Sequence, residues 1–372
     1  AAAEVKRSVL ELGGSDPNGD ICIETLPDES PTGTKSLGGS IKIFFHKVLS
    51  KLGVVEYEHP QLAIAVFPEA GEEFSYEKDM DEVRAAVAGA QRIGLFLHGI
   101  IGDTLEMAKA VRRPGSDGQT LEDAFDLVLT FDYENLNTPI SQTARDLGRR
   151  LAEAGLEAGH GKELTLIAHS MGGLVSRWYI EKEGGNAVVS RLIQLGTPNG
   201  GSPWANVYEL SSVLLARAIN GATFLQPYIL PLNFLGRYVE KLFVTLEEMR
   251  PSESDFLDRL NDGADPGIPY TIVAGNTKLI PVQLEAQQQK VLQKLITRFR
   301  NRAHYDALTM LLFRMANDIA VAVDSIRNIE GMEQWQTPPR VIEVGCDHIS
   351  YFADPVGLKA LAAAVKGQEE AV

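Results

Sequence analysis

The sequence predicts an α/β protein with a mainly parallel central sheet, on the basis of three observations. From residue 92 onward, short apolar runs typical of buried strands alternate with segments of helical periodicity. One such run leads into a turn of small residues around Ser170 and continues directly as a helix-like segment. The chain has 372 residues and is 44% hydrophobic, which suits a large buried core. These features favour one large domain with a modest appendage.

The predicted elements of the main domain, residues 91–372, follow in order along the chain. Strands are expected at residues 93–97, 125–131, 164–168, 191–195, 270–274 and 340–344, and helices at 139–156, 172–181 and 356–365. Two longer segments interrupt this alternation. We interpret them as helical insertions, the first at 199–265 and the second at 277–316.

Residues 1–90 precede this pattern and predict a small N-terminal α/β appendage of unknown role. Strand-like runs occur at 5–12, 21–26 and 61–67, with a helix-like segment at 41–52. The acidic stretch 72–82 is expected to be a solvated segment or an exposed helix.

Charge and cysteine content exclude several classes of function. The net charge of −15 argues against nucleic acid as a partner, because a polyanion would be repelled. No apolar run reaches the length of a membrane span, and no signal-like stretch occurs. The two cysteines, Cys22 and Cys346, lie far apart and suggest no disulfide framework. We therefore expect a reducing, cytoplasmic setting.

The segment 164–173 reads Leu-Thr-Leu-Ile-Ala-His-Ser-Met-Gly-Gly, the pattern of a nucleophile elbow. In such a turn Ser170 adopts a strained backbone conformation, so the residues two positions away, Ala168 and Gly172, must be small. The helix that follows directs its N-terminal N–H groups at the serine, which favours an anionic intermediate. The alternative is a buried or capping serine.

The strand at 93–97 runs into His98-Gly99-Ile100, which predicts an oxyanion loop. The backbone N–H groups of Ile100 and Met171 would then hold the developing negative charge. The alternative is a simple glycine turn. His98 is expected to order this loop and not to act as a base, because it precedes Ser170 in the chain.

An acid and a base are expected downstream of the serine. Asp318 lies in a polar turn and is the candidate that orients the histidine, with Asp324 and then Asp306 as alternatives. His348 follows the last predicted strand in a loop and is the candidate general base. His169, beside the serine, is expected to pack or hydrogen-bond locally.

Together these motifs resemble those of the α/β-hydrolase superfamily, and within it of lipases and esterases. The segment 195–202, Leu-Gly-Thr-Pro-Asn-Gly-Gly-Ser, is similar to a motif of triacylglycerol lipases and of GPI inositol-deacylase-like hydrolases. The residues around Asp318 are similar to the acid loop of bacterial lipases, except that Ile319 replaces a glycine. The resemblance covers residues 92–366 and implies an α/β-hydrolase fold with a helical cap or lid.

The expected function is therefore hydrolysis of carboxylic esters by a serine hydrolase. Ser170 would attack the ester, His348 would shuttle the proton and Asp318 would orient His348, through an acyl-enzyme intermediate. An amidase, peptidase or thioesterase with the same residues is an alternative, as is an inactive hydrolase fold that serves as an interaction module. Motifs for a metal or an organic cofactor are absent, and none is expected.

The two insertions bear on the substrate. The first is rich in Leu, Ile, Phe and Tyr between residues 203 and 260, which suits either a lid over a lipid or other hydrophobic ester, or plain packing on the core. The second carries interleaved basic and apolar residues at 290–302. That pattern fits an ordinary solvated helix face or a helix lying on an anionic membrane surface.

Overall fold

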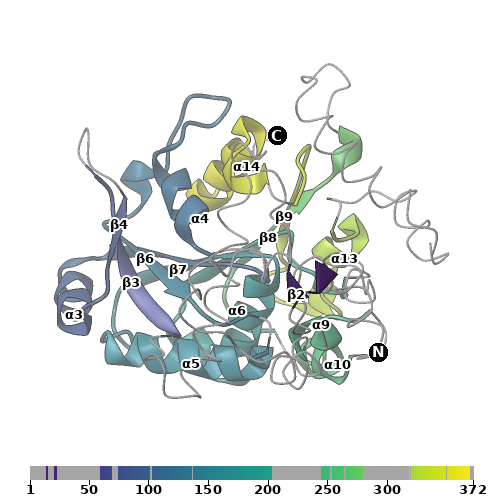
Figure 1. Ribbon diagram of the computed structural model, residues 1–372, viewed down its shortest axis with the longest axis horizontal. Helices are drawn as coiled ribbons and strands as arrows, with labels where there is room; N and C mark the ends of the chain where they lie inside the picture. The colour runs from purple at the N-terminus through teal and green to yellow at the C-terminus, as the bar shows by residue number, and fades with distance from the viewer. Residues whose placement is uncertain are drawn as a thin grey trace.

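A computed structural model of the chain shows one central sheet with helices on both faces (Figure 1). The structure describes residues 14–15, 21–22, 59–68, 74–100, 103–135, 137–202, 244–251, 254–263, 265–279, 318, 320–348 and 350–368. The sheet strands are β3 (Gln61–Val66), β4 (Ser75–Glu77), β5 (Arg92–Leu97), β6 (Leu127–Asp132), β7 (Glu163–His169), β8 (Arg191–Leu195), β9 (Tyr270–Gly275) and β10 (Arg340–Val344).

The sheet has eight strands in the order β10-β9-β8-β7-β5-β6-β3-β4. Every neighbouring pair from β10 to β6 is parallel, whereas β3 runs antiparallel to both β6 and β4. The carboxyl ends of the parallel strands therefore meet along one edge, where open α/β sheets hold their sites. The order, the antiparallel edge and the flanking helices confirm the predicted α/β-hydrolase fold class.

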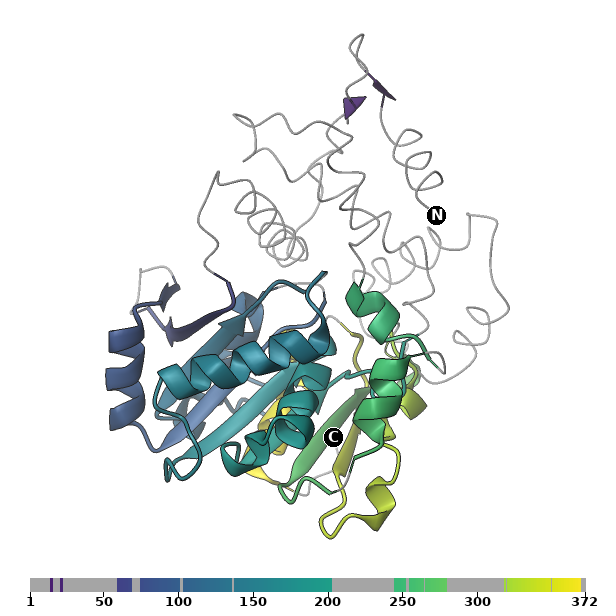
Figure 2. The same ribbon diagram turned by 90° about the horizontal axis from the view of Figure 1, so that it is seen from below.

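Two apolar cores lie on opposite faces of this sheet. One contains buried residues of α3 (Met80–Gly89), α5 (Ile140–Glu153) and α6 (Met171–Lys182). The other contains buried residues of α4 (Leu105–Lys109) and α14 (Pro355–Lys366). Figure 1 shows α4 and α14 above the sheet with α5 and α6 below it, and Figure 2 shows the α5–α6 face from below.

Alternation along the strands explains the two cores. In β5, Leu95 and Leu97 join the core under α5 and α6, while Phe96 joins the core under α4 and α14. Successive side chains of a strand point to opposite faces, so a strand covered on both sides reads as a continuous apolar run. This is the pattern from which the parallel sheet was predicted.

The remaining described helices are short. They are η1 (Ala110–Arg112), η2 (Glu122–Ala124), η3 (Gly185–Ala187), α9 (Val244–Glu248), α10 (Asp255–Asn261), η6 (Thr277–Leu279), α13 (Val323–Arg327), η7 (Met332–Gln334) and η8 (Ser350–Phe352). Among the described residues, none of the helices combines the length and apolar character needed to cross a bilayer.

Outside the two insertions, the predicted strands and helices of the main domain all occur: β8 and β10 have the predicted ends, and the ends of the others shift by up to three residues. The strand expected from Phe125 begins at Leu127, because the Phe125 ring packs against Gly94 of β5 and not in the sheet ladder. The helix expected to reach Leu156 ends at Glu153. Gly155, with a φ of 84°, ends it.

The predicted boundary at residue 90 is wrong for the residues next to it. β3 and β4 were assigned to a separate appendage, but they complete one edge of the central sheet, and α3 packs on the same core as α5. The sequence showed the strand at 61–67 without showing its partner, β6. Farther upstream, β1 (Gly14–Ser15) pairs antiparallel with β2 (Ile21–Cys22). The other predicted elements before residue 59 lie outside the described residues.

The first predicted insertion is described only in part. Its final helices, α9 and α10, lie beside α6, where Phe256 stacks on Trp178 with ring centroids 5.0 Å apart. Thr245 Oγ1 donates a hydrogen bond of 2.9 Å to the backbone carbonyl of Asn135, just beyond β6. The predicted lid residues 203–243 and most of the second insertion lie outside the described residues.

Candidate active site

Ser170 occupies a sharp turn between β7 and α6. Its φ of 53° and ψ of −126° make it the one non-glycine residue with a positive φ in the described part of the chain. Such a conformation is strained and persists only where the surroundings enforce it. The Ser170 N–H donates a 2.8 Å hydrogen bond to the carbonyl of Leu195 at the end of β8, which fixes the turn to the sheet.

The packing around the turn explains its small residues. A Cβ added to Gly172 would lie 2.5 Å from the backbone oxygen of His98. A Cβ on Gly99 would lie 2.7 Å from the Ser170 Cβ. Because both distances are shorter than real Cβ contacts, glycine at both positions allows the loop after β5 to approach the serine.

Three predicted residues come together at this turn. The Ser170 Oγ lies 3.0 Å from the Nε2 atom of His348. The Nδ1 atom of the same ring lies 2.7 Å from the Oδ2 atom of Asp318. His348 follows β10 and Asp318 lies between β9 and α13, so the parallel β9–β10 pair delivers both to the edge where β7 ends.

Asp318 is fully buried and held by several donors. Its Oδ1 accepts hydrogen bonds from the N–H groups of Ala320, at 3.1 Å, and Val321, at 2.8 Å. Its Oδ2 accepts the Tyr351 hydroxyl at 3.0 Å in addition to the His348 ring. The Tyr351 oxygen in turn accepts the N–H of Gly275 at 2.7 Å. These contacts keep the carboxylate in one orientation and satisfy it away from water.

Two opposing influences act on the pKa of His348, and their net effect raises it above its usual 6.5. Burial alone lowers the pKa, because it disfavours the charged ring. The charge and hydrogen bond of Asp318, with a further contribution from Asp347, outweigh that effect. The ring is thus disposed to accept a proton at Nε2, the atom that faces Ser170.

His169 supports the neighbouring loop. Its Nε2 donates a 2.8 Å hydrogen bond to the backbone carbonyl of His348, and the two rings lie 4.8 Å apart. Burial and the nearby His348 lower the pKa of His169 to about 3, so this ring stays neutral. Local packing or hydrogen bonding of His169 was predicted, and its hydrogen-bond partner is the backbone of His348, the candidate base.

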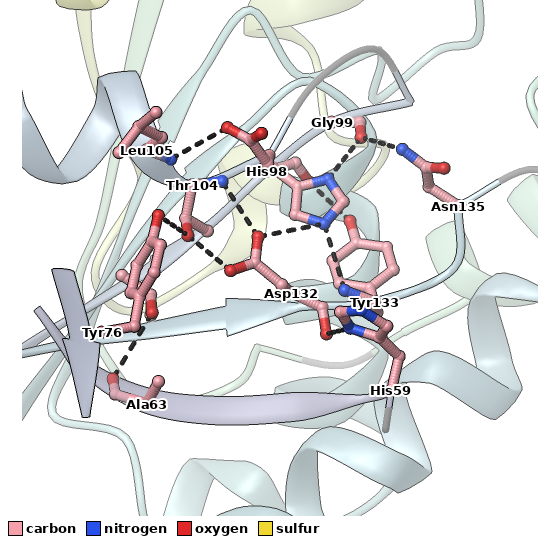
Figure 3. Close-up of polar contacts among 12 residues, drawn as sticks. His59, Ala63, Tyr76, His98, Gly99, Thr104, Leu105, Asp132, Tyr133 and Asn135 are labelled. Carbon is pink, nitrogen blue, oxygen red and sulfur yellow. Dashed lines mark hydrogen bonds and ion pairs between the residues drawn. The ribbon is translucent and has the colours of Figure 1, made fainter. Parts of the chain in front are cut away.

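The two candidate oxyanion donors lie on the segments that meet at Ser170. Ile100 is buried directly after Gly99, and Met171 is the first residue of α6. His98 orders this loop: its Nδ1 lies 2.8 Å from the carbonyl of Gly99, and its Nε2 accepts the N–H of Tyr133 at 3.2 Å (Figure 3). Burial lowers the pKa of His98 to about 4, so the ring is neutral.

Of the two alternatives to Asp318, only Asp324 lies among the described residues. Asp324 is exposed on α13, and Asp306 lies outside the described residues. Two residues of the site were not predicted: Tyr351, whose hydroxyl contacts Asp318, and Asn135, which contacts the loop at Gly99. No motif marks either residue. Among the described residues, no group of three or more His, Cys, Asp or Glu side chains is placed to hold a metal ion.

Comparisons with known proteins give one family and several distant folds. The family described as a domain of unknown function, DUF7379, matches residues 64–366. No curated protein matches the chain. Similar solved structures include the mature form of the Bacillus licheniformis lipase BlEst2, at 16% identity over 74% of this chain and 90% of that chain, with a TM-score of 0.42.

Two further structures are similarly distant. The phospholipase PlaB from Legionella pneumophila is 18% identical over 64% of this chain and 45% of that chain, with a TM-score of 0.40. MenH from S. aureus is 17% identical over 75% of this chain and 95% of that chain, with a TM-score of 0.37. None of these likenesses assigns a reaction to this chain.

Proposed function

The chain belongs to the family described as a domain of unknown function, DUF7379, and we propose that it is a serine hydrolase that cleaves carboxylic esters. One observation carries the proposal: the hydrogen-bonded series from Ser170 Oγ through the His348 ring to Asp318, with distances of 3.0 and 2.7 Å. A strained serine whose hydroxyl meets a histidine oriented by a buried carboxylate is the arrangement that activates a serine as a nucleophile.

Acylation follows from this geometry. His348 Nε2 takes the Ser170 proton as Oγ attacks the ester carbonyl, which forms the new C–O bond and an oxyanion. The Ile100 and Met171 N–H groups bind that oxyanion. Asp318 stabilises the imidazolium without taking its proton. His348 then protonates the departing alkoxide as the ester C–O bond breaks, which leaves an acyl group on Ser170.

Deacylation repeats the same steps with water. His348 removes a proton from water as the water oxygen attacks the acyl carbon, and the same N–H groups bind the second oxyanion. The bond to Ser170 breaks, Oγ recovers its proton from His348, and a carboxylic acid leaves. No step requires an oxidant or a reductant.

We further propose a lipid or other hydrophobic acyl ester as the substrate. The apolar composition of residues 203–260 supports this choice, because an acyl chain gains about 0.8 kcal/mol for each methylene that it buries. The basic and apolar residues at 290–302 support contact with an anionic membrane surface as a subsidiary proposal.

A substrate panel with a matched pair of serine variants tests the proposal. The panel contains p-nitrophenyl esters of increasing chain length, a triglyceride, a phospholipid, a thioester and an anilide. Wild-type protein should hydrolyse the longer esters and react with a fluorophosphonate probe, whereas Ser170→Ala should do neither. Ser176→Ala is the control, because Ser176 is a buried serine of α6, close to Ser170 in the chain, whose hydroxyl donates to the Gly172 carbonyl within that helix.

Each outcome of the panel has a defined meaning. Full hydrolysis by Ser170→Ala would refute the assignment of the nucleophile. Faster hydrolysis of the anilide or the thioester than of any ester would mean that the protein is an amidase or a thioesterase and not an esterase. If folded wild-type protein neither hydrolyses any substrate of the panel nor reacts with the fluorophosphonate probe, the interaction-module alternative is favoured.

A further inference from the structure

The end of β6 and the residues just after it hold the loop that follows β5. Asp132 is the last residue of β6, and Tyr133 and Asn135 follow it; all three contact residues between His98 and Thr104 (Figure 3). β5 and β6 are parallel neighbours, so their carboxyl ends lie side by side at the edge that carries Ser170. The segment 132–135 is thus placed to set the shape of the proposed oxyanion loop.

The side chain of Asn135 contacts the carbonyl groups of two successive peptide groups. Its Nδ2 atom lies 3.0 Å from the carbonyl oxygen of Gly99 and 3.0 Å from that of Ile100, and the residue is fully buried. The Gly99 carbonyl and the Ile100 N–H belong to the same planar peptide group, in which they point in opposite directions. A donor that fixes the carbonyl therefore also fixes the direction of the N–H.

A second donor holds the same carbonyl. The Tyr133 N–H donates to His98 Nε2, so Nε2 carries no proton and Nδ1 is the protonated nitrogen of the neutral ring. His98 Nδ1 then donates to the Gly99 carbonyl at 2.8 Å. Two buried donors, His98 and Asn135, thus converge on one oxygen from different elements.

The preceding peptide and the far end of the loop are restrained as well. The Tyr133 hydroxyl donates a 2.5 Å hydrogen bond to the carbonyl of His98, and the two rings stack with centroids 4.2 Å apart. Farther along, the Asp132 carboxylate accepts the Thr104 N–H at 2.9 Å and the Thr104 hydroxyl at 2.8 Å. Asn135 is itself fixed, because its backbone carbonyl accepts the Thr245 hydroxyl.

From these contacts we infer that Asn135 is a positioning residue of the hydrolase, which fixes the Gly99–Ile100 peptide so that the Ile100 N–H faces the oxyanion formed at Ser170. The inference rests on the proposed function. Asn135 does not touch the reacting atoms; it acts through the peptide that it holds. Its contribution is preorganisation, which lowers the energy of the tetrahedral intermediate more than that of the bound ester.

Asn135→Asp is the sharpest test, because it keeps the size of the side chain and replaces the donor with an acceptor that repels the Gly99 carbonyl. Loss of an oxyanion donor lowers kcat by about 10²–10³-fold, and a misaligned donor should cost less, about 10–100-fold. We expect KM to change by less than about threefold, because ground-state contacts remain. Tyr133→Phe, which removes the hydroxyl bonded to the His98 carbonyl, is a second and milder variant with a smaller loss of kcat.

An inhibitor pair separates positioning from general damage to the fold. A trifluoromethyl ketone adds to the serine and forms an oxyanion, whereas the methyl ketone of the same chain binds without adding. In Asn135→Asp, the trifluoromethyl ketone should bind at least about tenfold more weakly while the methyl ketone stays within about threefold. The matched control is Asn199→Asp, another buried asparagine whose Nδ2 donates to a backbone carbonyl, that of Ile326, at 2.7 Å.

The outcomes distinguish this inference from the proposed function. Ser170-dependent hydrolysis in wild-type protein with unchanged kcat in both Asn135→Asp and Tyr133→Phe would overturn the inference alone. An equal loss of affinity for both ketones, or the same kcat loss in folded Asn199→Asp, would also overturn it. Wild-type protein without Ser170-dependent hydrolysis would refute the proposed function and the inference together.

Discussion

Two buried histidine–aspartate pairs lie near Ser170, and their electrostatics are opposite. In the first pair, His348 Nδ1 lies 2.7 Å from Asp318, and the pKa of the histidine is raised. In the second pair, His98 Nε2 lies 3.8 Å from Asp132, and burial lowers the pKa of the histidine to about 4. The same two residue types therefore produce a basic histidine at one place and, at the other, a neutral histidine that orders a loop.

The partners of the two rings explain this difference. Both nitrogens of His98 are occupied by the main chain, one by the Gly99 carbonyl and the other by the Tyr133 N–H. A proton added at Nε2 would face another N–H group. His348 instead presents Nε2 to the Ser170 hydroxyl and binds a carboxylate with Nδ1. A hydrogen bond to a carboxylate makes a buried histidine basic, whereas proximity without one does not overcome burial.

The same substitution in the two histidines gives the largest predicted contrast. His348→Leu removes the proton carrier and should lower kcat by about 10⁴–10⁶-fold, while Asp318 keeps its hydrogen bond from Tyr351. His98→Leu leaves the buried Tyr133 N–H without its ring acceptor, which should lower the free energy of unfolding by about 1–3 kcal/mol. Ester turnover and urea unfolding of both variants measure the two effects. Comparable kcat losses in the two folded variants would contradict the assignment of His348 as the base and of His98 as a residue that orders the loop.

Asp318→Asn tests whether the carboxylate sets the basicity of His348. Loss of the correctly oriented charge should lower kcat by about 10³–10⁴-fold. His348 acts as a base only when neutral, so kcat/KM rises with pH through its pKa, with a midpoint above 6.5 in wild-type protein. Removal of the Asp318 charge lowers that pKa, and the midpoint should move to lower pH. A midpoint that stays fixed in the variant would show that another group governs the profile.

The two sides of the site differed in how far the sequence could predict them. The turn at Ser170 could be predicted because its constraint is local: a strained serine needs small residues within two positions. Asp318 was harder, since an aspartate at a polar turn is common and Asp324 fitted nearly as well. Their places in the structure separate them, because Asp318 Oδ2 lies 2.7 Å from His348 Nδ1 whereas Asp324 is exposed on α13.

The contacts of the oxyanion loop were not predicted, for a related reason. Asn135 lies 36 residues from Gly99 in the chain and belongs to no motif. The available signal was topological: polar residues that follow two neighbouring parallel strands lie at one edge. Likewise β3 was predicted as a strand, but its antiparallel place beside β6 depends on partners distant in sequence. Local sterics can be read from sequence, whereas long-range pairing requires the fold.

Tyr351→Phe tests how the Tyr351 hydroxyl affects Asp318 and, through Asp318, the pKa of His348. The hydroxyl donates to Asp318 Oδ2 and accepts the Gly275 N–H, so its removal leaves a buried donor unpaired and should cost about 1–3 kcal/mol of stability. The hydroxyl also draws charge from the oxygen that binds His348. Without it the midpoint of kcat/KM should move to higher pH, opposite to Asp318→Asn. A shift in the same direction as Asp318→Asn would mean that the hydroxyl does not compete with His348 for the carboxylate.

The smallest expected effect concerns proton binding beside the loop of His98. Burial, and then the nearby Asp132, raise the pKa of Asp103 from 3.8 to about 6. Between these values the folded protein binds a proton more tightly than the unfolded chain does, so this group makes the fold less stable as pH rises from about 4 to 6. Asp103→Asn keeps an acceptor for the Leu105 N–H and cannot ionise, so the change in Tm from pH 4 to pH 6 should be more positive in the variant than in wild-type protein.

The control is Asp262→Asn, which makes the same change of charge at an exposed position. Tm measured at half-unit steps between pH 4 and 7 should give the same slope for Asp262→Asn as for wild-type protein and a more positive slope for Asp103→Asn. Equal slopes in all three proteins would mean that Asp103 titrates alike in the folded and unfolded chain. The neutral state of His98 would be unaffected, because burial of the ring lowers its pKa.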